Sequence, residues 1–340
     1  SLGKIELITQ GFLLKKRYRQ RSHRVLPLRD LVGIDHLKYS RRLSRLTTDM
    51  AAECSFEAAA RRMLEHHSVE ISISAVRKLT LSNAEQASIL LDKERNTAKE
   101  QLPKRLVMEM DGVMVPVVDY KDSSDRRKTK SLRWQEMKVG AVQDPDRLQV
   151  LYGCSFEGAD VLGNRLRILT CEIGGENAPP LHGVGDGATW IKEQGERIGG
   201  CQYKHLIDFY HFSGYLHAAF EGSKRHELMV HRCKEEAKSG NLGKALRRLR
   251  RELKKNPQHE GVIACLRYIK NRPGEFLYDQ AIEKGLPIGS GLIESTNRSL
   301  IQKRLKLPGA WWLPNNAGKM ANLRSLRANG FWSELWQQAA

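Results

Sequence analysis

Residues 106–118 read LVMEMDGVMVPVV, and this stretch decides the fold. The apolar and alternating residues at 106–110 and 113–118 are typical of β-strands, whose successive side chains point to opposite faces of a sheet. Asp111 and Gly112 lie between the two runs and form a dipeptide that favours a tight turn. The sequence therefore predicts a hairpin here, with Asp111 at the end of its first strand.

The strand pattern continues beyond this stretch and then mixes with helices. We expect a helix at 188–198 and further strands at 134–142, 147–154, 166–173, 182–185 and 203–209. Several strands, then a helix and another strand, are typical of an α/β domain with a mixed sheet.

Helical patterns follow on the C-terminal side. Residues 213–284 predict an all-helical, basic insertion, and helices are expected again at 292–305 and within 311–336. A crowded basic group lies in the insertion, at Arg247, Arg248, Arg250 and Arg251. Such a group is either a solvated helix face or a surface that contacts phosphates, and we favour phosphate contact.

The N-terminal side is also helical. Ser55 is a good N-cap for a helix at 56–66, and a break at 68–72 precedes a helix from about Ser74. Arg77 and Lys78 fall near the start of that last helix. This is the spacing of a DNA-binding helix-turn-helix, although any small helical bundle produces it too. A basic run at 15–24 strengthens the DNA-binding interpretation.

The charge distribution points to a polyanionic partner. The 340 residues carry 57 Lys and Arg against 39 Asp and Glu, a formal net charge of +18. Residues 1–100 contribute +7, residues 101–220 contribute −1, and residues 221–340 contribute +12. Basic flanks around a segment that keeps its carboxylates are expected of an enzyme that acts on nucleic acids.

Other compositional features exclude membrane and secreted classes. The chain has no apolar run of about 18 residues that could cross a bilayer, and no signal-peptide pattern. The six cysteines form no C-x-x-C pair, so we expect reduced thiols in a cytosolic protein. The chain begins with Ser1 in place of methionine, which suggests that it is trimmed or lacks its first residues.

Three acidic residues lie at element boundaries: Asp111, Asp186 and Glu294. Each alone is ordinary, because Asp-Gly favours turns and Glu is common in the first turn of a helix. Together with the predicted strand order they indicate an RNase H-like core, an α/β fold in which such carboxylates hold two Mg²⁺ ions for phosphoryl transfer.

Several motifs carry a resemblance to a known family. They are Asp111-Gly112, GDGATWI at 185–191, DFYH at 208–211, GSGLIES at 289–295 and the stretch 304–312. In this order they resemble bacterial insertion-sequence transposases of the ISKra type, which are related to the Mutator-like branch of DDE transposases. The resemblance covers roughly residues 101–340. It implies a bacterial cytoplasmic protein that is associated with the nucleoid when it holds DNA.

The resemblance implies a DDE triad of Asp111, Asp186 and Glu294, with gaps of 75 and 108 residues. It implies Mg²⁺ as cofactor, replaceable by Mn²⁺, with two ions per active site. The partners would be the terminal inverted repeats and target DNA, bound by a homodimer or higher oligomer. Asp208 and His211 match a signature of the family with an orienting or DNA-contacting role. Asp208 also remains the rival of Asp186 as second metal ligand.

We expect four regions: an N-terminal basic arm and helical DNA-binding region at 1–100, the first part of the core at 101–212, the basic insertion at 213–285 and the last part of the core with C-terminal helices at 286–340. Two rivals stay open, a structure-specific nuclease or resolvase on the same core and a domesticated DNA-binding protein without activity.

The remaining candidates have weaker signals. Glu109 and Glu136 are either carboxylates that support the site or outward-facing strand residues. His205, His217, His226 and His231 are interpreted as ordinary surface or core histidines. Trp311 and Trp312 are expected in the core, with base stacking by one of them as the alternative. Further expected DNA contacts are Arg298, Lys303, Arg304, Lys306 and Trp312.

Overall fold

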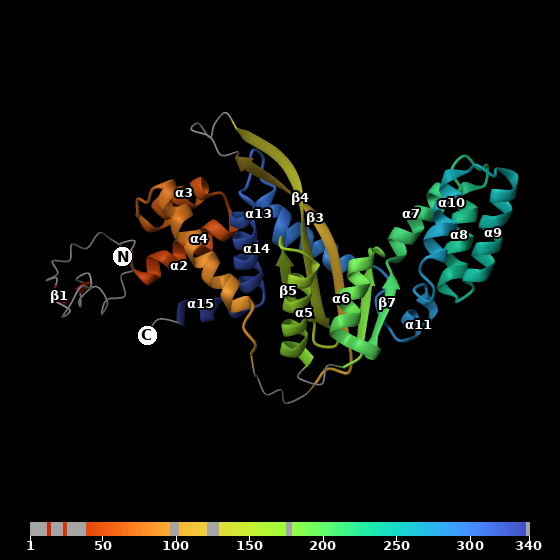
Figure 1. The fold of residues 1–340 in the computed structure, drawn as a ribbon, viewed down its shortest axis with the longest axis horizontal. Coiled ribbons are helices and arrows are strands. Elements are labelled where there is room, and N and C mark those ends of the chain that lie inside the picture. The colour runs from red at the N-terminus through yellow and green to blue at the C-terminus, as the bar shows by residue number, and fades with distance from the viewer. Residues whose placement is uncertain are drawn as a thin grey trace, which may run out of the picture. The chain divides into compact units, whose positions relative to one another are not determined.

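A computed structural model of the chain describes residues 12–14, 23–25, 39–95, 102–120, 129–174 and 179–337, the first two ranges by their backbone only. Most of the basic run at 15–24 lies outside these residues. The chain divides into two compact units (Figure 1). The first comprises residues 1–91, 116–133 and 302–340, and the second comprises residues 92–115 and 134–301.

The sheet of the second unit has five strands: β3 (Leu106–Tyr120), β4 (Lys130–Asp144), β5 (Gln149–Ser155), β6 (Leu181–Gly185) and β7 (Tyr203–Ile207). Their order across the sheet is β5-β4-β3-β6-β7. β4 and β5 pair antiparallel, whereas β6 is parallel to both β3 and β7. The predicted α/β class with a mixed sheet is confirmed.

The predicted hairpin at Asp111-Gly112 is wrong, because β3 runs through both residues as one strand of 15 residues. Gly112 keeps a negative φ, so it does not adopt the left-handed conformation of a two-residue hairpin turn. It lies instead beneath a neighbouring side chain: a Cβ on Gly112 would come within 1.8 Å of Glu136 Oε1 on β4. Gly112 therefore serves the packing of β3 against β4.

The predicted strand at 166–173 is also wrong, since these residues belong to helix α5 (Ala159–Gly174). Leu162, Leu166, Leu169 and Ile173 are all buried and recur at helical spacing. The predicted helix after β6 is confirmed as α6 (Thr189–Gly199), which is followed by the short turn η1 (Gly200–Gln202). Helices α5 and α6 contact each other and pack against the sheet (Figure 1).

The two faces of the sheet have different neighbours. A Cβ on Gly140 of β4 would contact both Leu166 of α5 and Met110 of β3, so Met110 faces α5. Because side chains alternate along a strand, Glu109 and Asp111 point to the opposite face. Glu136 lies over Gly112 on the α5 side.

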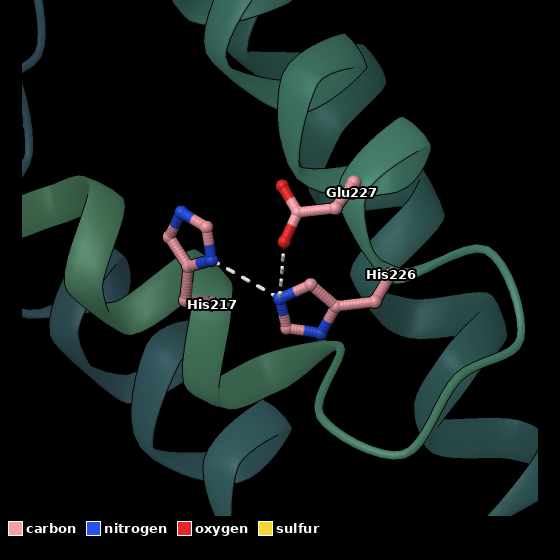
Figure 2. A group of neighbouring side chains, drawn as sticks. All are labelled: His217, His226 and Glu227. Atoms are coloured by element: carbon pink, nitrogen blue, oxygen red, sulfur yellow. Dashed lines mark hydrogen bonds and ion pairs between the residues drawn. The ribbon is translucent and has the colours of Figure 1, made fainter.

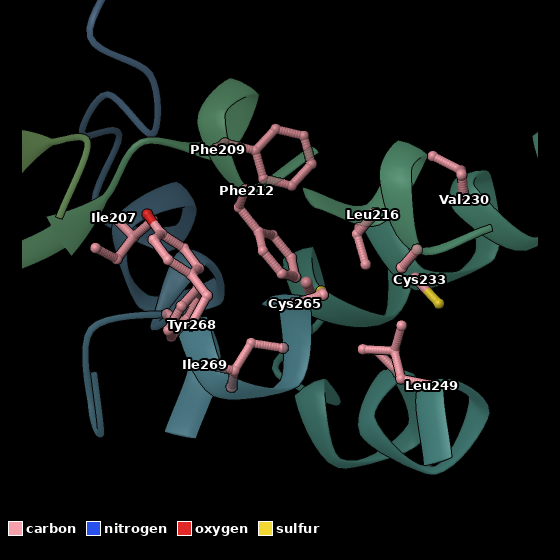
Figure 3. Packing of buried hydrophobic residues seen from close by; sticks show 14 of the residues in the cluster. Ile207, Phe209, Phe212, Leu216, Val230, Cys233, Leu249, Cys265, Tyr268 and Ile269 are labelled. Atoms are coloured by element: carbon pink, nitrogen blue, oxygen red, sulfur yellow. The ribbon is translucent and has the colours of Figure 1, made fainter. Parts of the chain in front are cut away.

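The predicted helical insertion consists of α7 (Phe209–Ala219), α8 (His226–Lys238), α9 (Leu242–Lys255), α10 (Glu260–Lys270) and α11 (Tyr278–Glu283). Buried apolar side chains from these helices form one cluster, part of which Figure 3 shows. Phe212 and Leu216 of α7 lie at its centre with Cys233 of α8, Leu249 of α9 and Cys265 of α10. The same cluster includes Leu206 and Ile207 of β7, so the hydrophobic core of the insertion continues onto the sheet.

A continuous helical stretch follows the insertion. It begins as α12 (Gly291–Thr296), widens to the π-helix η2 (Asn297–Gln302) and ends as α13 (Lys303–Leu305). The helix predicted at 292–305 is thus confirmed. π-helical turns inside α-helices are frequent at functional sites.

The first unit is mainly helical. It contains α2 (Arg41–Glu53), α3 (Phe56–His67), α4 (Ile73–Leu91), α14 (Pro314–Ala328), η3 (Phe331–Ser333) and α15 (Glu334–Gln337). Ser55 caps α3 as predicted, because its Oγ accepts the N–H of Ala58 at 3.1 Å. Two short antiparallel strands lie near the N-terminus, β1 (Phe12–Leu14) and β2 (His23–Val25). A search of the described residues finds no helix with the length and apolar character that membrane crossing requires.

Candidate active site

Strand register places three aspartates side by side across the sheet. Glu109 of β3 pairs with Val184 of β6, and Gly185 of β6 pairs with Ile207 of β7. Asp111 lies two residues after Glu109, Asp186 lies one residue after Gly185, and Asp208 lies one residue after Ile207. The same register, continued past the paired residues, therefore aligns the three aspartates. The N–H of Asp208 donates to the carbonyl of Gly185 at 2.7 Å, which holds the last two together.

Helix α12 lies across the same face of β3. The N–H of Ile293 donates to Glu109 Oε2 at 2.8 Å, and Asn297 Nδ2 donates to Asp111 Oδ2 at 2.8 Å. Ile293 and Asn297 are four residues apart on the helix, and Glu109 and Asp111 are two residues apart on the strand. Both spacings correspond to about 6 to 7 Å, so the two hydrogen bonds fit the same alignment of helix and strand. Glu294 follows Ile293 and lies one helical turn, three residues, before Asn297. It therefore belongs to the part of the helix that these bonds hold against β3.

Asp208 holds the start of this helix. Its Oδ2 accepts both the N–H and the Oγ–H of Ser290 at 2.5 Å, and its Oδ1 accepts the N–H of His211 at 2.6 Å. A Cβ on Gly289 would come within 2.7 Å of the Tyr210 ring, so this close approach requires a glycine. Asp208 is buried and both of its oxygens are engaged, which fits a positioning role.

Asp186 is held by its own loop and by the insertion. Its Oδ1 accepts the N–H of Ala188 at 2.9 Å, and its carbonyl accepts the hydroxyl of Tyr268 at 2.7 Å. Arg272 Nη2 donates to the carbonyl of Gly187 at 2.8 Å. Gly187 has a φ of +84°, a conformation that other residues adopt only with strain. Tyr268 of α10 and Arg272, two residues after the helix ends, therefore fix the Asp186 loop.

The carboxylates influence one another electrostatically. Burial raises the pKa of Asp111, and the negative charge of Asp186 adds to this rise. Burial likewise raises the pKa of Glu109 to about 7, with smaller contributions from Asp208 and Glu294. Glu294 is exposed, and within the described part of the chain its carboxylate makes no hydrogen bond or ion pair. Asp111 and Asp186 thus form a concentrated negative charge, with Glu294 open to solvent.

The three predicted triad carboxylates do not converge on one point. Within the described residues, one group of His, Cys, Asp or Glu has all its ligand atoms within 4.8 Å of one another, and it is His217, His226 and Glu227. Asp111, Asp186 and Glu294 do not form such a group within the described residues. Two-ion sites place their ions about 3.5–4 Å apart and do not require all carboxylates to meet.

The predicted DNA contacts divide into exposed and buried residues. Those with exposed side chains are Arg77, Lys78, Arg247, Arg250, Arg251, Arg298 and Lys303. Lys306 is half-buried, and so is Arg248, which forms a two-pronged ion pair with Glu236 at 2.7 and 3.0 Å.

Arg304 and Trp312 are not DNA contacts in this structure, contrary to the sequence prediction. Arg304 is 2% exposed, its Nε donates to the carbonyl of Ala51 at 2.9 Å, and its guanidinium lies between the rings of Phe56 and Trp312. Burial lowers its pKa to about 10. Trp312 is also buried and donates to the carbonyl of Leu305 at 3.2 Å. Both residues stabilise the core of the first unit.

The structure distinguishes the two interpretations given above for Glu109 and Glu136. Glu109 is buried and binds α12, whereas Glu136 is exposed on the opposite face and pairs with Lys138 at 2.8 Å. His211 is exposed, and its ring lies near those of Tyr215 and Tyr268.

Sequence reasoning missed Asn297, Ser290, Tyr268 and Arg272, which position the candidate triad. Asn297 carried a usable signal, because it lies three residues after Glu294 and hence on the same helix face. Tyr268 and Arg272 carried none, since they are separated from Asp186 by more than 80 residues.

Comparisons with known proteins complete this description. No curated protein matches the chain. Among solved structures, the Drosophila P element transposase strand transfer complex aligns over 92% of this chain and 84% of that chain, with 14% sequence identity and a TM-score of 0.33. The model of the uncharacterised protein family UPF0236 matches residues 17–333. With most of its length covered by that model, the chain belongs to the UPF0236 family.

Proposed function

We propose that this protein is a DDE-type DNA transposase that cuts at transposon ends and joins the resulting 3′-hydroxyl groups to target DNA. The observation that carries the proposal is that Asp111 lies on β3 and Asp186 directly follows the neighbouring parallel strand β6, while Asn297 attaches the helix of Glu294 to Asp111 at 2.8 Å. The ordered motifs that resemble insertion-sequence transposases support the same function.

The sheet supports an RNase H-like core. Strands β3, β4 and β5 are neighbours in chain order, and β6 and β7 add on the other side of β3 in parallel. In our proposal Asp111 lies on the central strand and Asp186 directly follows the next one. The insertion α7–α11 separates these strands from the helix that carries Glu294, which accounts for the gap of 108 residues.

The residues fit a magnesium site. Asp111, Asp186 and Glu294 offer carboxylate oxygens, the ligands that Mg²⁺ prefers. A cation would offset the effects of burial and of the Asp186 charge, which raise the pKa of Asp111. We propose these three residues as the ligands, in preference to Asp208, because Asp208 is buried and holds Ser290 and His211, whereas Asp111 and Asp186 are half-buried and Glu294 is exposed. Two bound Mg²⁺ ions would supply Lewis-acid charge for phosphoryl transfer.

The protein residues around the triad would keep this geometry. Glu109 and Asp208 hold the beginning of α12, while Tyr268 and Arg272 hold the Asp186 loop. The charged groups that would meet DNA phosphates are the exposed arginines of α9 and Arg77 and Lys78 of α4. We propose that α3 and α4 act as a helix-turn-helix, because a turn with Ser68 in the left-handed conformation joins them. Pairing of two transposon ends would require an oligomer.

The proposal is tested with a donor plasmid that carries this gene together with its own flanking genomic DNA. Excision and integration are scored by sequencing, and cut ends are mapped on purified DNA with Mg²⁺. We expect Asp111→Asn, Asp186→Asn and Glu294→Gln each to abolish cutting and joining while DNA binding remains. The matched control is Glu136→Gln, which removes a nearby carboxylate on the opposite face of the sheet and should retain activity.

The outcomes separate the rival functions. Cutting that depends on the three carboxylates but never yields joined 3′ ends would identify a nuclease or resolvase and overturn the transposase proposal. DNA binding with no cutting by the wild-type protein would identify a binding protein. Full activity in Asp111→Asn would overturn the assignment of the triad.

A further inference from the structure

A second group of potential metal ligands lies in the insertion, away from the sheet. His217 is in the last turn of α7, and His226 and Glu227 begin α8 (Figure 2). A short loop joins the two helices, and within it Gly222 has a φ of +77° while the N–H of Ser223 donates to the carbonyl of Phe220. This tight connection brings two histidines nine residues apart into contact.

The distances within this group match those expected around one metal ion. His217 Nδ1 lies 3.0 Å from His226 Nε2, and His226 Nε2 lies 3.6 Å from Glu227 Oε1. A tetrahedral ion with ligands at about 2.0–2.1 Å separates neighbouring ligand atoms by about 3.3 Å. The three ligand atoms all lie within 4.8 Å of one another, so one ion could reach them with small side-chain adjustments.

The surroundings of His226 prepare it to bind a metal. Its Nδ1 lies 2.9 Å from the carbonyl of Phe220, which can only accept a hydrogen bond, so Nδ1 carries the proton. The lone pair is then on Nε2, which faces His217 and Glu227 (Figure 2). Metal-binding histidines usually donate their second ring N–H to a carbonyl or carboxylate in this manner.

We propose that His217, His226 and Glu227 bind a divalent transition-metal ion of the zinc class, which clamps α7 to α8 at the entrance of the insertion. Two imidazole nitrogens and one carboxylate oxygen are a ligand set that Zn²⁺ accepts, with solvent in the fourth position. Glu227 is exposed and both histidines are half-buried, so an ion and its solvent ligand can reach the group. His217 then carries its proton on Nε2.

This site is independent of the proposed transposase site in its chemistry. Nitrogen ligands favour zinc, cobalt, nickel or copper, whereas the carboxylates of the sheet favour Mg²⁺. Without a metal, the same geometry is a hydrogen bond between the two imidazoles, with one ring donating and the other accepting. The test must therefore distinguish a bound ion from this hydrogen bond.

The probe is Co²⁺ added to the chelator-treated full-length chain carrying Asp111→Asn and Asp186→Asn, which disables the carboxylate site. Tetrahedral Co²⁺ absorbs visible light much more strongly than hydrated Co²⁺. We expect one equivalent to give this absorption, and Zn²⁺ to displace it. His217→Gln and His226→Gln should each weaken Co²⁺ binding by at least about 100-fold, and Glu227→Gln by about 10-fold.

The matched control is His231→Ala, which removes an exposed histidine of the same helix and should bind Co²⁺ normally. Circular dichroism and thermal unfolding establish that each variant folds. If the wild-type ligand set gives no tetrahedral absorption, the group is a hydrogen-bonded pair and the proposal fails. Equal Co²⁺ binding by the folded His217→Gln and His226→Gln variants, or thiolate charge-transfer bands that indicate cysteine ligands, would also overturn it.

Discussion

Glu109 and Asp111 share one face of β3, yet their surroundings differ. Glu109 is 2% exposed and accepts an N–H from the start of α12, whereas Asp111 is only half-buried and receives Asn297 at one oxygen. A carboxylate at a helix N-terminus satisfies backbone donors that the helix itself leaves free. The other Asp111 oxygen, Oδ1, accepts the N–H of Gly112 at 2.7 Å. Glu109 therefore positions the helix, whereas Asp111 is the more solvent-accessible carboxylate of the two.

At this scale we predict opposite effects of Asp111→Asn on activity and stability. The substitution removes a proposed metal ligand and should lower DNA cutting by more than about 100-fold. It also removes a negative charge whose pKa burial and Asp186 raise, so the folded protein should become more stable at pH 8. Cutting assays and thermal unfolding without divalent ions measure both effects. A lower melting temperature with retained cutting would contradict this account.

Asn297→Ala tests whether positioning of the helix matters. Loss of the bond to Asp111 should lower cutting about 10- to 100-fold, with DNA affinity unchanged, because the ligand residues remain but are held less firmly. The control is Ser299→Ala, which removes a bond within the helix to the carbonyl of Ser295. An equal loss in both variants would indicate general damage to the helix and would argue against a positioning role for Asn297.

The sequence placed Asp186 and Glu294 at the ends of elements, but it did not reveal the residues that hold them there. Asp186 follows a buried apolar run, and Glu294 follows a glycine-rich break. The hydropathy pattern of the sequence therefore placed both residues at the ends of elements. Arg304 could not be interpreted correctly, because a basic residue in a basic segment favours the surface. Its burial depends on Phe56 and Trp312, which meet it only in the folded first unit.

The wrong predictions of secondary structure fall where one sequence pattern is compatible with two conformations. Asp111-Gly112 is a frequent turn dipeptide, but the apolar residues on both sides fit a long buried strand equally well, and cross-strand packing by Glu136 decides for the strand. Residues 166–173 are too short an apolar run to separate helix from strand by periodicity alone. The strands at β5, β6 and β7 and the helices α3 and α6 were predicted because caps, glycines or turns delimit them.

Helix α9 carries the prediction for DNA binding. Arg247, Arg250 and Arg251 are exposed, whereas Arg248 is paired with Glu236. Replacing the three exposed arginines with alanine should weaken DNA binding at all sequences and reduce the slope of log affinity against log salt by up to about 3. Arg248→Ala should leave that slope unchanged. DNA affinity measured at several salt concentrations gives this slope. An unchanged slope in the triple variant would exclude α9 as a phosphate-contacting surface.

At the scale of the whole molecule, the charge counts favour a polyanionic partner, but they do not give the boundaries of the compact units. Basic flanks around a near-neutral middle are visible in the charge counts. The two compact units, however, combine segments that lie far apart in sequence, such as residues 1–91 with 302–340. Contacts between distant segments arise from tertiary packing, and the periodicity of a local stretch of sequence does not predict them.

The stability of the folded chain should fall in mild acid, in part through His205. This ring is almost fully buried, and its Nε2 lies 3.9 Å from Glu275, beyond hydrogen-bonding distance; burial lowers its pKa to about 4. Between pH 6.5 and 4 the unfolded chain binds a proton that the folded chain does not, so stability present above pH 6.5 is lost as pH falls. The loss is at most about 3.5 kcal/mol, from about 1.4 kcal/mol per unit of pKa difference.

His205→Gln removes this titration and should flatten the pH dependence. Urea unfolding measures the free energy of unfolding of the wild type and the variant at pH 7.5 and at pH 5. Comparing the two proteins removes the contributions of the other titrating groups, which both proteins share. The unfolding free energy of the wild type should decrease more than that of the variant. Equal decreases would show that His205 is protonated equally in the folded and unfolded states.

The central claim is that Asp111, Asp186 and Glu294 hold divalent metal ions. The most direct measurement is anomalous X-ray scattering from crystals soaked in Mn²⁺, which substitutes for Mg²⁺ and needs no knowledge of the DNA sequence. Our account predicts an anomalous peak bound by Asp111 and Asp186, with Glu294 beside it and Asp208 still bonded to Ser290. A map without a peak at Asp111 and Asp186, or with Mn²⁺ bound by Asp208 in place of Asp186, would contradict it.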